Sequence, residues 1–167
     1  MYDQLTANDI RKMQEEVEYR KTVLRHELLI PVKEARAQGD LSENFEYKAA
    51  KKEKNRNESR IRYLEKMIKT AQIIDDTSAE DEVGINNTVT VYFEEDDEEE
   101  TYKLVTTVRG DSLNGYITNE SPIGKAILGH KVGDRCLVQL PNGGGYEVII
   151  RKIDKSTDDS EDALRSF

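Results

Sequence analysis

The sequence predicts an α+β protein with an N-terminal antiparallel coiled-coil hairpin and a C-terminal domain that has an antiparallel sheet and one short helix. Three observations support this class. Apolar residues within residues 1–75 recur at the three- and four-residue steps of one helix face. A glycine and a cluster of acids interrupt that pattern near residue 40. The alternation that is typical of strands begins after residue 85.

The first helix is expected to begin at Thr6, an N-cap with Asp9 three residues later as its capping-box partner. Its apolar stripe contains Ile10, Met13, Val17, Leu24, Leu28, Val32 and Ala35. Arg20 falls on this stripe, where its aliphatic stem can cover the seam while the guanidinium stays in water. Pro31 removes a backbone hydrogen bond and should bend the helix, which Gly39 is expected to end.

A second stripe follows, with the alternating steps of a heptad seam. Its members are Tyr47, Ala50, Lys54, Asn57, Ile61, Leu64, Ile68 and Ala71. If the chain folds back near residue 40, paired residue numbers have a constant sum of 81 or 82, which places Asn57 opposite Leu24. Lys54 and Asn57 would either set the register of the seam or bind a ligand.

Strand patterns define the C-terminal part. The segments 88–93 and 101–108 are expected to be strands around the acidic run 94–100, which is either a solvated hairpin turn or a metal site. Ser121 as N-cap and Pro122 at the first helical position open a short helix, which Gly129 closes. The segments 135–140 and 146–153 form a final hairpin.

We therefore expect a hairpin with an acidic tip at residues 1–75 and a linker at 76–87. A globular domain follows at 88–155, and an acidic flexible tail at 156–167. Residues 1–75 carry 16 Lys and Arg against 14 Asp and Glu, whereas the remainder carries 9 against 20. This asymmetry suggests two parts with different partners, and the overall acidity argues against a general duplex-DNA binder.

The composition also bears on location. No apolar run approaches the roughly 18 residues of a membrane span, and the N-terminus lacks the apolar core of a signal peptide. Cys136 is the single cysteine, so no internal disulfide can form and a cytoplasmic protein is expected. In the strand pattern of 135–140, Cys136 is expected to fill the core.

The stretch "GDLSEN" at residues 39–44 has two interpretations. Asp40 could cap the second helix while Glu43 reaches back to it, or the two carboxylates could bind a metal. Mg²⁺ requires about six ligands, so another macromolecule would have to supply most of them. Arms of about 30 residues, roughly 45 Å long, could deliver these acids into a deep channel. His26 and His130 have no plausible nucleophile or ligand neighbours in sequence.

Three segments, "EARAQGDLSENFEYKAAKKE", "SRIRYLEKMIKTAQIID" and "SPIGKAILGHKVGD", closely resemble bacterial GreA/GreB transcript-cleavage factors. The resemblance covers roughly residues 5–154. It implies a coiled-coil hairpin and an FKBP-like C-terminal domain, with bacterial RNA polymerase as the partner. It further implies that the hairpin enters the secondary channel and stimulates the polymerase's Mg²⁺-dependent cleavage of backtracked RNA. Such a monomeric factor is not itself an enzyme and needs no metal or cofactor of its own.

The resemblance also suggests site residues. Asp40 and Glu43 match the metal-assisting acids, and Leu41 and Ser42 belong to the same polymerase-contacting tip. A basic patch that attracts the nascent RNA 3′ end is matched by Arg36, Lys48, Lys51 and Lys52. The alternative for this patch is a solvated helix face paired with Glu53 and Glu58. The segment Ser121, Pro122, Ile123 and Gly124 resembles a polymerase-contacting region, or is a plain helix start.

One departure from the family pattern concerns the tip. Phe45 replaces the usual small residue, and its ring could stack on a base or pack on the hairpin. Two other functions remain open. A non-cleaving regulator of the secondary channel would share the fold, although the intact pair Asp40 and Glu43 favours cleavage. A peptidyl-prolyl isomerase is less consistent with the few aromatic residues of the second domain.

Overall fold

The computed structural model describes residues 2–39 and 44–166. They divide into two compact units. The hairpin unit contains Ile10–Ala71, and the globular unit contains Asp3–Asp9 together with Gln72–Ser166. None of the helices in the described ranges has the length and apolarity that crossing a bilayer requires.

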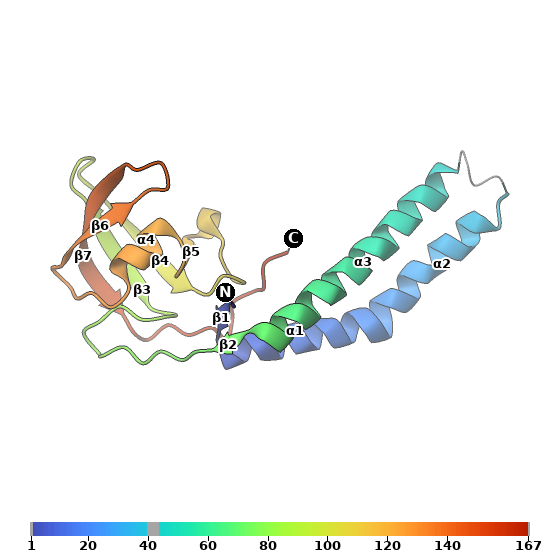
Figure 1. The fold of residues 1–167 in the computed structure, drawn as a ribbon, viewed down its shortest axis with the longest axis horizontal. Helices are drawn as coiled ribbons and strands as arrows, with labels where there is room; N and C mark the ends of the chain where they lie inside the picture. The colour runs from blue at the N-terminus through green and yellow to red at the C-terminus, as the bar shows by residue number, and fades with distance from the viewer. Residues whose placement is uncertain (1, 40–43, 167) are drawn as a thin grey trace. The chain divides into compact units, whose positions relative to one another are not determined.

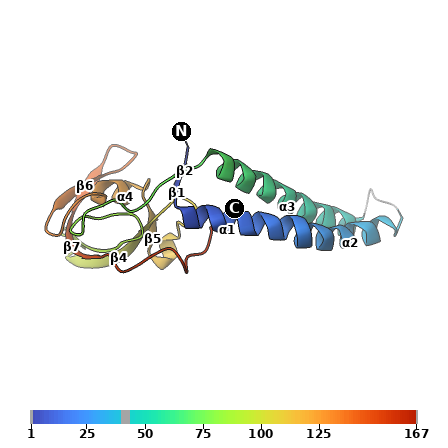
Figure 2. The ribbon, with the colours of Figure 1, turned by 90° about the horizontal axis from the view of Figure 1, so that it is seen from below.

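The hairpin unit has two antiparallel arms (Figures 1 and 2). The first arm consists of α1 (Ala7–Tyr19), the π-helical segment η1 (Arg20–Leu24) and α2 (Arg25–Arg36). The second arm is α3 (Phe45–Thr70), which packs against α2. Figure 1 shows the first arm changing direction where α1 passes into α2. The predicted α+β class, with a helical hairpin followed by a sheet domain, is confirmed.

The predicted seam is confirmed as the inner face of the hairpin. Its fully buried members are Met13, Val17, Val32 and Ala35 in the first arm and Asn57, Ile61 and Leu64 in the second. Asn57, predicted to lie opposite Leu24, faces the π-helical turn that contains Leu24, and its Nδ2 lies 3.3 Å from the main-chain oxygen of Arg20 at the start of that turn. The prediction assumed an uninterrupted α-helix, whereas Arg20–Leu24 forms a π-helical turn, which holds extra backbone.

The middle of the seam is polar. Asn57 Oδ1 accepts a hydrogen bond of 2.9 Å from Arg20 Nη1, and Glu16 accepts bonds of 2.8 Å from both Arg20 and Arg60. Burial would raise the pKa of Glu16, but the hydrogen bonds from Arg60 and Arg20 outweigh it and hold that pKa below its ordinary value. Sequence analysis missed Arg60, which is only 5% exposed. These cross-arm bonds satisfy the polar groups that interrupt the apolar stripe.

The globular unit contains a mixed sheet in the order β5–β4–β3–β7–β6 among the described residues. The strands are β3 (Thr88–Phe93), β4 (Glu98–Val105), β5 (Tyr116–Thr118), β6 (Arg135–Gln139) and β7 (Gly145–Asp154). Neighbouring strands are antiparallel except β4 and β5, which are parallel. The expected, mostly antiparallel sheet is thus confirmed, with one parallel pair at its edge. A strand as short as β5 carries too little alternation to be predicted.

The turn between β3 and β4 is shorter than the acidic run 94–100 that was expected to form it. The turn occupies residues 94–97, and Glu98–Glu100 already pair with β3. These glutamates can extend the strand because their side chains are exposed to water. Within the described ranges, no three His, Cys, Asp or Glu side chains are grouped as metal ligands.

The core lies between the sheet and α4 (Pro122–Ile127), together with residues that precede β3. It includes Val83, Ile85, Val89, Val91, Leu104, Ile127, Val138, Val148 and Ile150. Cys136 is 2% exposed within this core, as predicted, and burial raises its pKa to about 11. Two short strands that the sequence did not predict, β1 (Gln4–Leu5) and β2 (Gln72–Ile73), pair in parallel.

The start of α1 carries the predicted capping box, because the Thr6 N–H donates to Asp9 Oδ2 at 3.0 Å and the Asp9 N–H donates to Thr6 Oγ1 at 3.2 Å. Asp9 also forms a 2.7 Å ion pair with Arg109, whose side chain is fully buried. The same guanidinium pairs with Asp162 at 2.7 Å. Asp162 is 3% exposed, so the segment expected to be a flexible tail contributes a buried residue to this unit.

Candidate functional site at the hairpin turn

Backbone geometry and hydrogen bonds define where α2 stops and where α3 starts on either side of the turn. α2 ends at Arg36, and Gly39 has φ +109°, in the left-handed region that favours glycine. α3 begins after Asn44, whose Oδ1 accepts a hydrogen bond of 2.9 Å from the Tyr47 N–H. Asn44 Nδ2 donates to the Ala35 main-chain oxygen at 2.7 Å. One amide side chain therefore caps the second arm and fastens it to the first.

This arrangement corrects the capping interpretation of the tip acids. The N-cap of α3 is Asn44 rather than Asp40. Asn is among the preferred N-cap residues, and Asn44 directly precedes the helical pattern; that signal was present in the sequence. Asp40, Leu41, Ser42 and Glu43 themselves lie outside the described residues.

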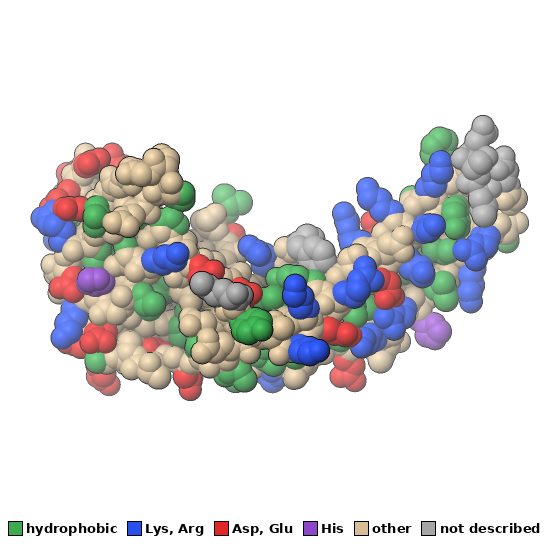
Figure 3. Space-filling view, viewed as in Figure 1, with side chains coloured by type: hydrophobic (Ala, Val, Ile, Leu, Met, Phe, Trp, Pro, Cys, Tyr) green, Lys and Arg blue, Asp and Glu red, His purple; other side chains and the backbone are tan. Residues whose placement is uncertain are grey.

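Three of the four predicted RNA-binding cations lie against aromatic rings near the turn. Lys48 Nζ is 5.6 Å from the centre of the Phe45 ring. Arg36 Cζ and Lys51 Nζ are 5.6 and 5.9 Å from the centre of the Tyr47 ring. Lys52 is exposed on α3. Figure 3 shows Lys and Arg side chains gathered over both arms on the visible face.

The carboxylates proposed as partners for this face have other neighbours. Glu53 lies 3.5 Å from Arg56, and Glu58 forms two hydrogen bonds, of 2.8 and 2.9 Å, with Arg25. Glu53 therefore pairs with a cation of α3, as the alternative of a solvated and paired face predicts, whereas Glu58 pairs with the first arm. Among the described residues, Arg36, Lys48 and Lys51 lie against aromatic rings, an arrangement that leaves their positive charge available to a polyanion.

The second candidate segment is mostly structural. Ser121 Oγ donates to the Thr118 main-chain oxygen at 2.6 Å and accepts from the Gly124 N–H at 3.1 Å, which confirms it as the N-cap of α4. Ile123 and Gly124 are buried. A Cβ on Gly124 would lie 2.0 Å from the Thr118 oxygen, so only glycine fits there. Pro122 is the remaining member of the segment and is partly exposed.

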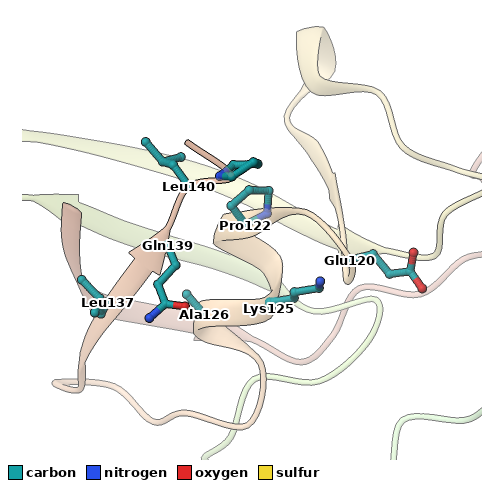
Figure 4. Close-up of a pocket in the computed structure, with 8 residues that line it drawn as sticks. Glu120, Pro122, Lys125, Ala126, Leu137, Gln139 and Leu140 are labelled. Carbon is teal, nitrogen blue, oxygen red and sulfur yellow. The ribbon is translucent and has the colours of Figure 1, made fainter. Parts of the chain in front are cut away.

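Pro122 borders an open groove of about 500 Å³ between α4 and β6 (Figure 4). The lining consists of Glu120, Pro122, Lys125, Ala126, Leu137, Gln139, Leu140 and Pro141. Leu137 is 55% exposed, because the alternation along β6 buries Cys136 and Val138 and turns Leu137 outward. Sequence analysis missed Leu137, although an apolar residue on the solvent side of a strand was a visible signal.

The fold and these sites define a class of protein: a helical hairpin with cations on the helices beside its turn, followed in the chain by a small mixed-sheet domain that carries a surface groove. Family models give the particular identity. Residues 3–73 match the model described as transcription elongation factor, N-terminal, and residues 78–155 match the C-terminal model of transcription elongation factor GreA/GreB. The chain belongs to the GreA/GreB family of transcription elongation factors.

Two GreA relatives agree with this assignment. Transcription elongation factor GreA of Thermoanaerobacter pseudethanolicus is 49% identical over 140 residues, which cover 83% of this chain and 89% of the relative. The Bacillus subtilis GreA is 44% identical over 147 residues, which cover 88% and 94%. A solved structure of the transcription factor Gfh1 is 27% identical, with a TM-score of 0.44 over 92% of this chain and 97% of the other.

Proposed function

We propose that this protein binds bacterial RNA polymerase, inserts its hairpin into the secondary channel and stimulates the polymerase's own cleavage of backtracked RNA. Cleavage creates a new RNA 3′ end at the active site and so releases arrested complexes. The protein acts in the cytoplasm as a monomeric factor rather than as an enzyme. Its family membership supports a role in elongation, and the turn of the hairpin supports the cleavage chemistry.

The observation that carries this proposal is the cap of α3. Because Asn44 caps the helix and binds the opposite arm, Asp40 and Glu43 are not needed for capping and can serve another purpose. A pair of carboxylates is chemically suited to Mg²⁺, which prefers oxygen ligands, but it supplies too few of the roughly six that the ion requires. The polymerase would contribute the remaining ligands and the substrate.

In this proposal, Asp40 and Glu43 help to hold Mg²⁺ in the polymerase active site. When bound beside an RNA phosphate, the metal stabilises the attacking and leaving oxygens of the hydrolysis. The chain itself would add negative charge that favours binding of the ion. The helices that flank the turn would hold these two carboxylates in position. Leu41 and Ser42, between the two acids, would contact the polymerase around the same site.

The cationic face would guide the RNA. Arg36, Lys48, Lys51 and Lys52 lie on the helices that flank the turn, within two helical turns of the ends of α2 and α3. Their charge favours the extruded RNA 3′ end, whose phosphates are negative. Such contacts orient a strand but do not read its sequence.

The groove beside Pro122 is the surface that we propose docks on the polymerase. Leu137 and Leu140 give it an apolar wall, and Lys125 and Glu120 give it a polar rim, a division typical of protein interfaces. Ser121, Ile123 and Gly124 support this surface from within, because they fix the start of α4 rather than face outward.

The decisive experiment measures RNA cleavage in stalled elongation complexes with wild-type protein and with Asp40→Asn plus Glu43→Gln. We expect the double variant to bind polymerase and to unfold at the wild-type temperature, but to give only the cleavage of polymerase alone. Glu46→Gln, an exposed acid in the first turn of α3, is the matched control and should stimulate normally. Normal cleavage by the double variant would remove the acids from the mechanism. A wild-type protein that binds without stimulating cleavage would be the non-cleaving regulator.

A further inference from the structure

Phe45 is an exposed aromatic residue at the start of α3. Its side chain is 79% exposed although it directly follows the cap that ends the turn. The ring therefore does not pack on the hairpin, which was one of two interpretations of this residue. An apolar ring held in water gains free energy when a partner covers it.

We propose that Phe45 and Lys48 form a stacking platform for one base of single-stranded RNA. In the same proposal, Tyr47 positions Arg36 and Lys51 to contact the neighbouring phosphates. The identity of the nucleic acid rests on the proposed function, which brings an RNA 3′ end to this turn. The platform deepens that function because it adds contact with a base to the attraction of phosphates.

Helical geometry places these residues in two matched pairs. Phe45 and Lys48 are three residues apart, and Tyr47 and Lys51 are four apart, so each cation lies on the same face as its ring. The ring of Tyr47 is approached by Arg36 from the other arm, and Arg36 Nη2 lies 3.5 Å from the Tyr47 hydroxyl oxygen. The hydrogen bond from Arg36 lowers the pKa of Tyr47, and the positive charge of Lys51 acts in the same direction. Tyr47 therefore gathers cations from both arms.

The occupant follows from this combination of groups. Single-stranded nucleic acids bind where aromatic rings alternate with cations, since bases stack on the rings and phosphates pair with the charges. A peptide segment would match the apolar ring, but not the four cations Arg36, Lys48, Lys51 and Lys52 around it. Stacking tolerates any base, which suits a factor that meets RNA ends of arbitrary sequence.

The test measures RNA affinity of the full-length protein without polymerase. A fluorescein-labelled six-nucleotide RNA is titrated at low salt, and its anisotropy is recorded. We expect Phe45→Ala to weaken binding about 10-fold and Phe45→Trp to retain it, because one stacked base contributes about 5- to 100-fold. Tyr19→Ala is the matched control, since Tyr19 is 52% exposed on α1 and should not affect binding.

A second ligand separates stacking from general destabilisation. With an RNA of the same length that contains abasic sugars, Phe45→Ala and wild type should bind equally, because no base remains to stack. Lys48→Ala should instead weaken both RNAs and reduce the dependence of affinity on salt by about one phosphate contact. A Phe45→Ala protein that distinguishes the two RNAs as wild type does would overturn the platform.

Three other results would also contradict the proposal. They are unchanged RNA affinity in Phe45→Ala, no saturable RNA binding by the wild type, and a loss confined to polymerase binding, which would make the ring a protein contact. The proposed function fails separately, in cleavage by Asp40→Asn plus Glu43→Gln. Because RNA affinity is measured without polymerase or cleavage, either hypothesis can fail while the other stands.

Discussion

Arg109 and Asp162 form a buried ion pair, with Arg109 Nη1 2.7 Å from Asp162 Oδ2, although they are 53 residues apart in the chain. The other partner of this guanidinium, Asp9, comes from the first turn of α1. Asp162 also accepts a hydrogen bond of 2.9 Å from Lys103 Nζ. One buried arginine of the globular unit thus binds carboxylates from segments that are far apart in the sequence.

Removal of one of these carboxylates should destabilise the globular unit. Asp162→Ala leaves the buried Arg109 with less compensating charge, and we expect a loss of about 3 kcal/mol in the free energy of unfolding. Chemical denaturation followed by tyrosine fluorescence measures this change. Glu161→Ala is the control, because Glu161 is exposed and has the same charge one position away. Equal midpoints for the two variants would show that the Asp162 pair does not stabilise the fold.

The stability of the hairpin should depend on pH through Glu16. Its pKa in the folded protein is held below the ordinary value of 4.5, so its contribution is complete at neutral pH and is lost as the pH falls through the folded pKa. We expect the melting temperature, followed by circular dichroism, to fall between about pH 5 and pH 3. Glu16→Gln should flatten this part of the curve.

Glu15→Gln is the neighbouring control for that experiment. Glu15 pairs with Arg11 on the surface, where both side chains are more than half exposed. An exposed pair contributes little to stability, so this variant should follow the wild-type curve. If Glu16→Gln also follows it, the cross-arm bonds from Arg20 and Arg60 do not account for acid sensitivity.

The two hydrogen bonds of Asn44 can be separated by mutation. Asn44→Ala removes both and should destabilise the hairpin by about 1 to 2 kcal/mol, the range of a lost N-cap. Asn44→Asp keeps the acceptor for the Tyr47 N–H but loses the donor to the Ala35 oxygen, so its loss should be smaller. Thermal unfolding of the three proteins gives the order, and Asn55→Ala, an exposed site within α3, serves as control. A neutral Asn44→Ala would exclude Asn44 as the fastening residue.

Gly124 should not tolerate a methyl group. Gly124→Ala places a Cβ against the Thr118 main-chain oxygen, and the required shift of α4 should cost about 1 to 3 kcal/mol. Gly144→Ala is the control, since the closest atom to its Cβ is a side-chain oxygen at 3.3 Å, in an exposed turn. Differential scanning calorimetry should therefore show a lower melting temperature for Gly124→Ala only. Identical curves would mean that α4 can move away without cost.

The helices and strands were predictable because their buried side chains recur at regular intervals in the sequence. The seam of the hairpin, the capping box of Thr6 and Asp9, and the strand 88–93 follow from such patterns. The π-helical turn that faces Asn57 was not predictable, since such a turn has no pattern of its own. The cluster around Arg109 was also missed, because its partners are far apart in sequence.

The candidate site was predictable in composition but not in arrangement. The cations were identified from sequence, yet their approach to the rings of Phe45 and Tyr47 depends on side-chain geometry. Ile123 and Gly124 are buried, so much of the segment that was expected to contact a partner lies beneath the groove between α4 and β6 rather than on its surface. Leu137 also lines this groove, but it lies on β6, and the sequence motif covered only the start of α4.

The double role of Asn44 has an evolutionary consequence. One side chain both starts α3 and fastens it to α2, so we expect the contact between the arms to tolerate substitutions between Gly39 and Asn44. Related hairpins that keep this asparagine are therefore expected to differ in what they bind through substitutions between Gly39 and Asn44, while the contact between their arms is kept.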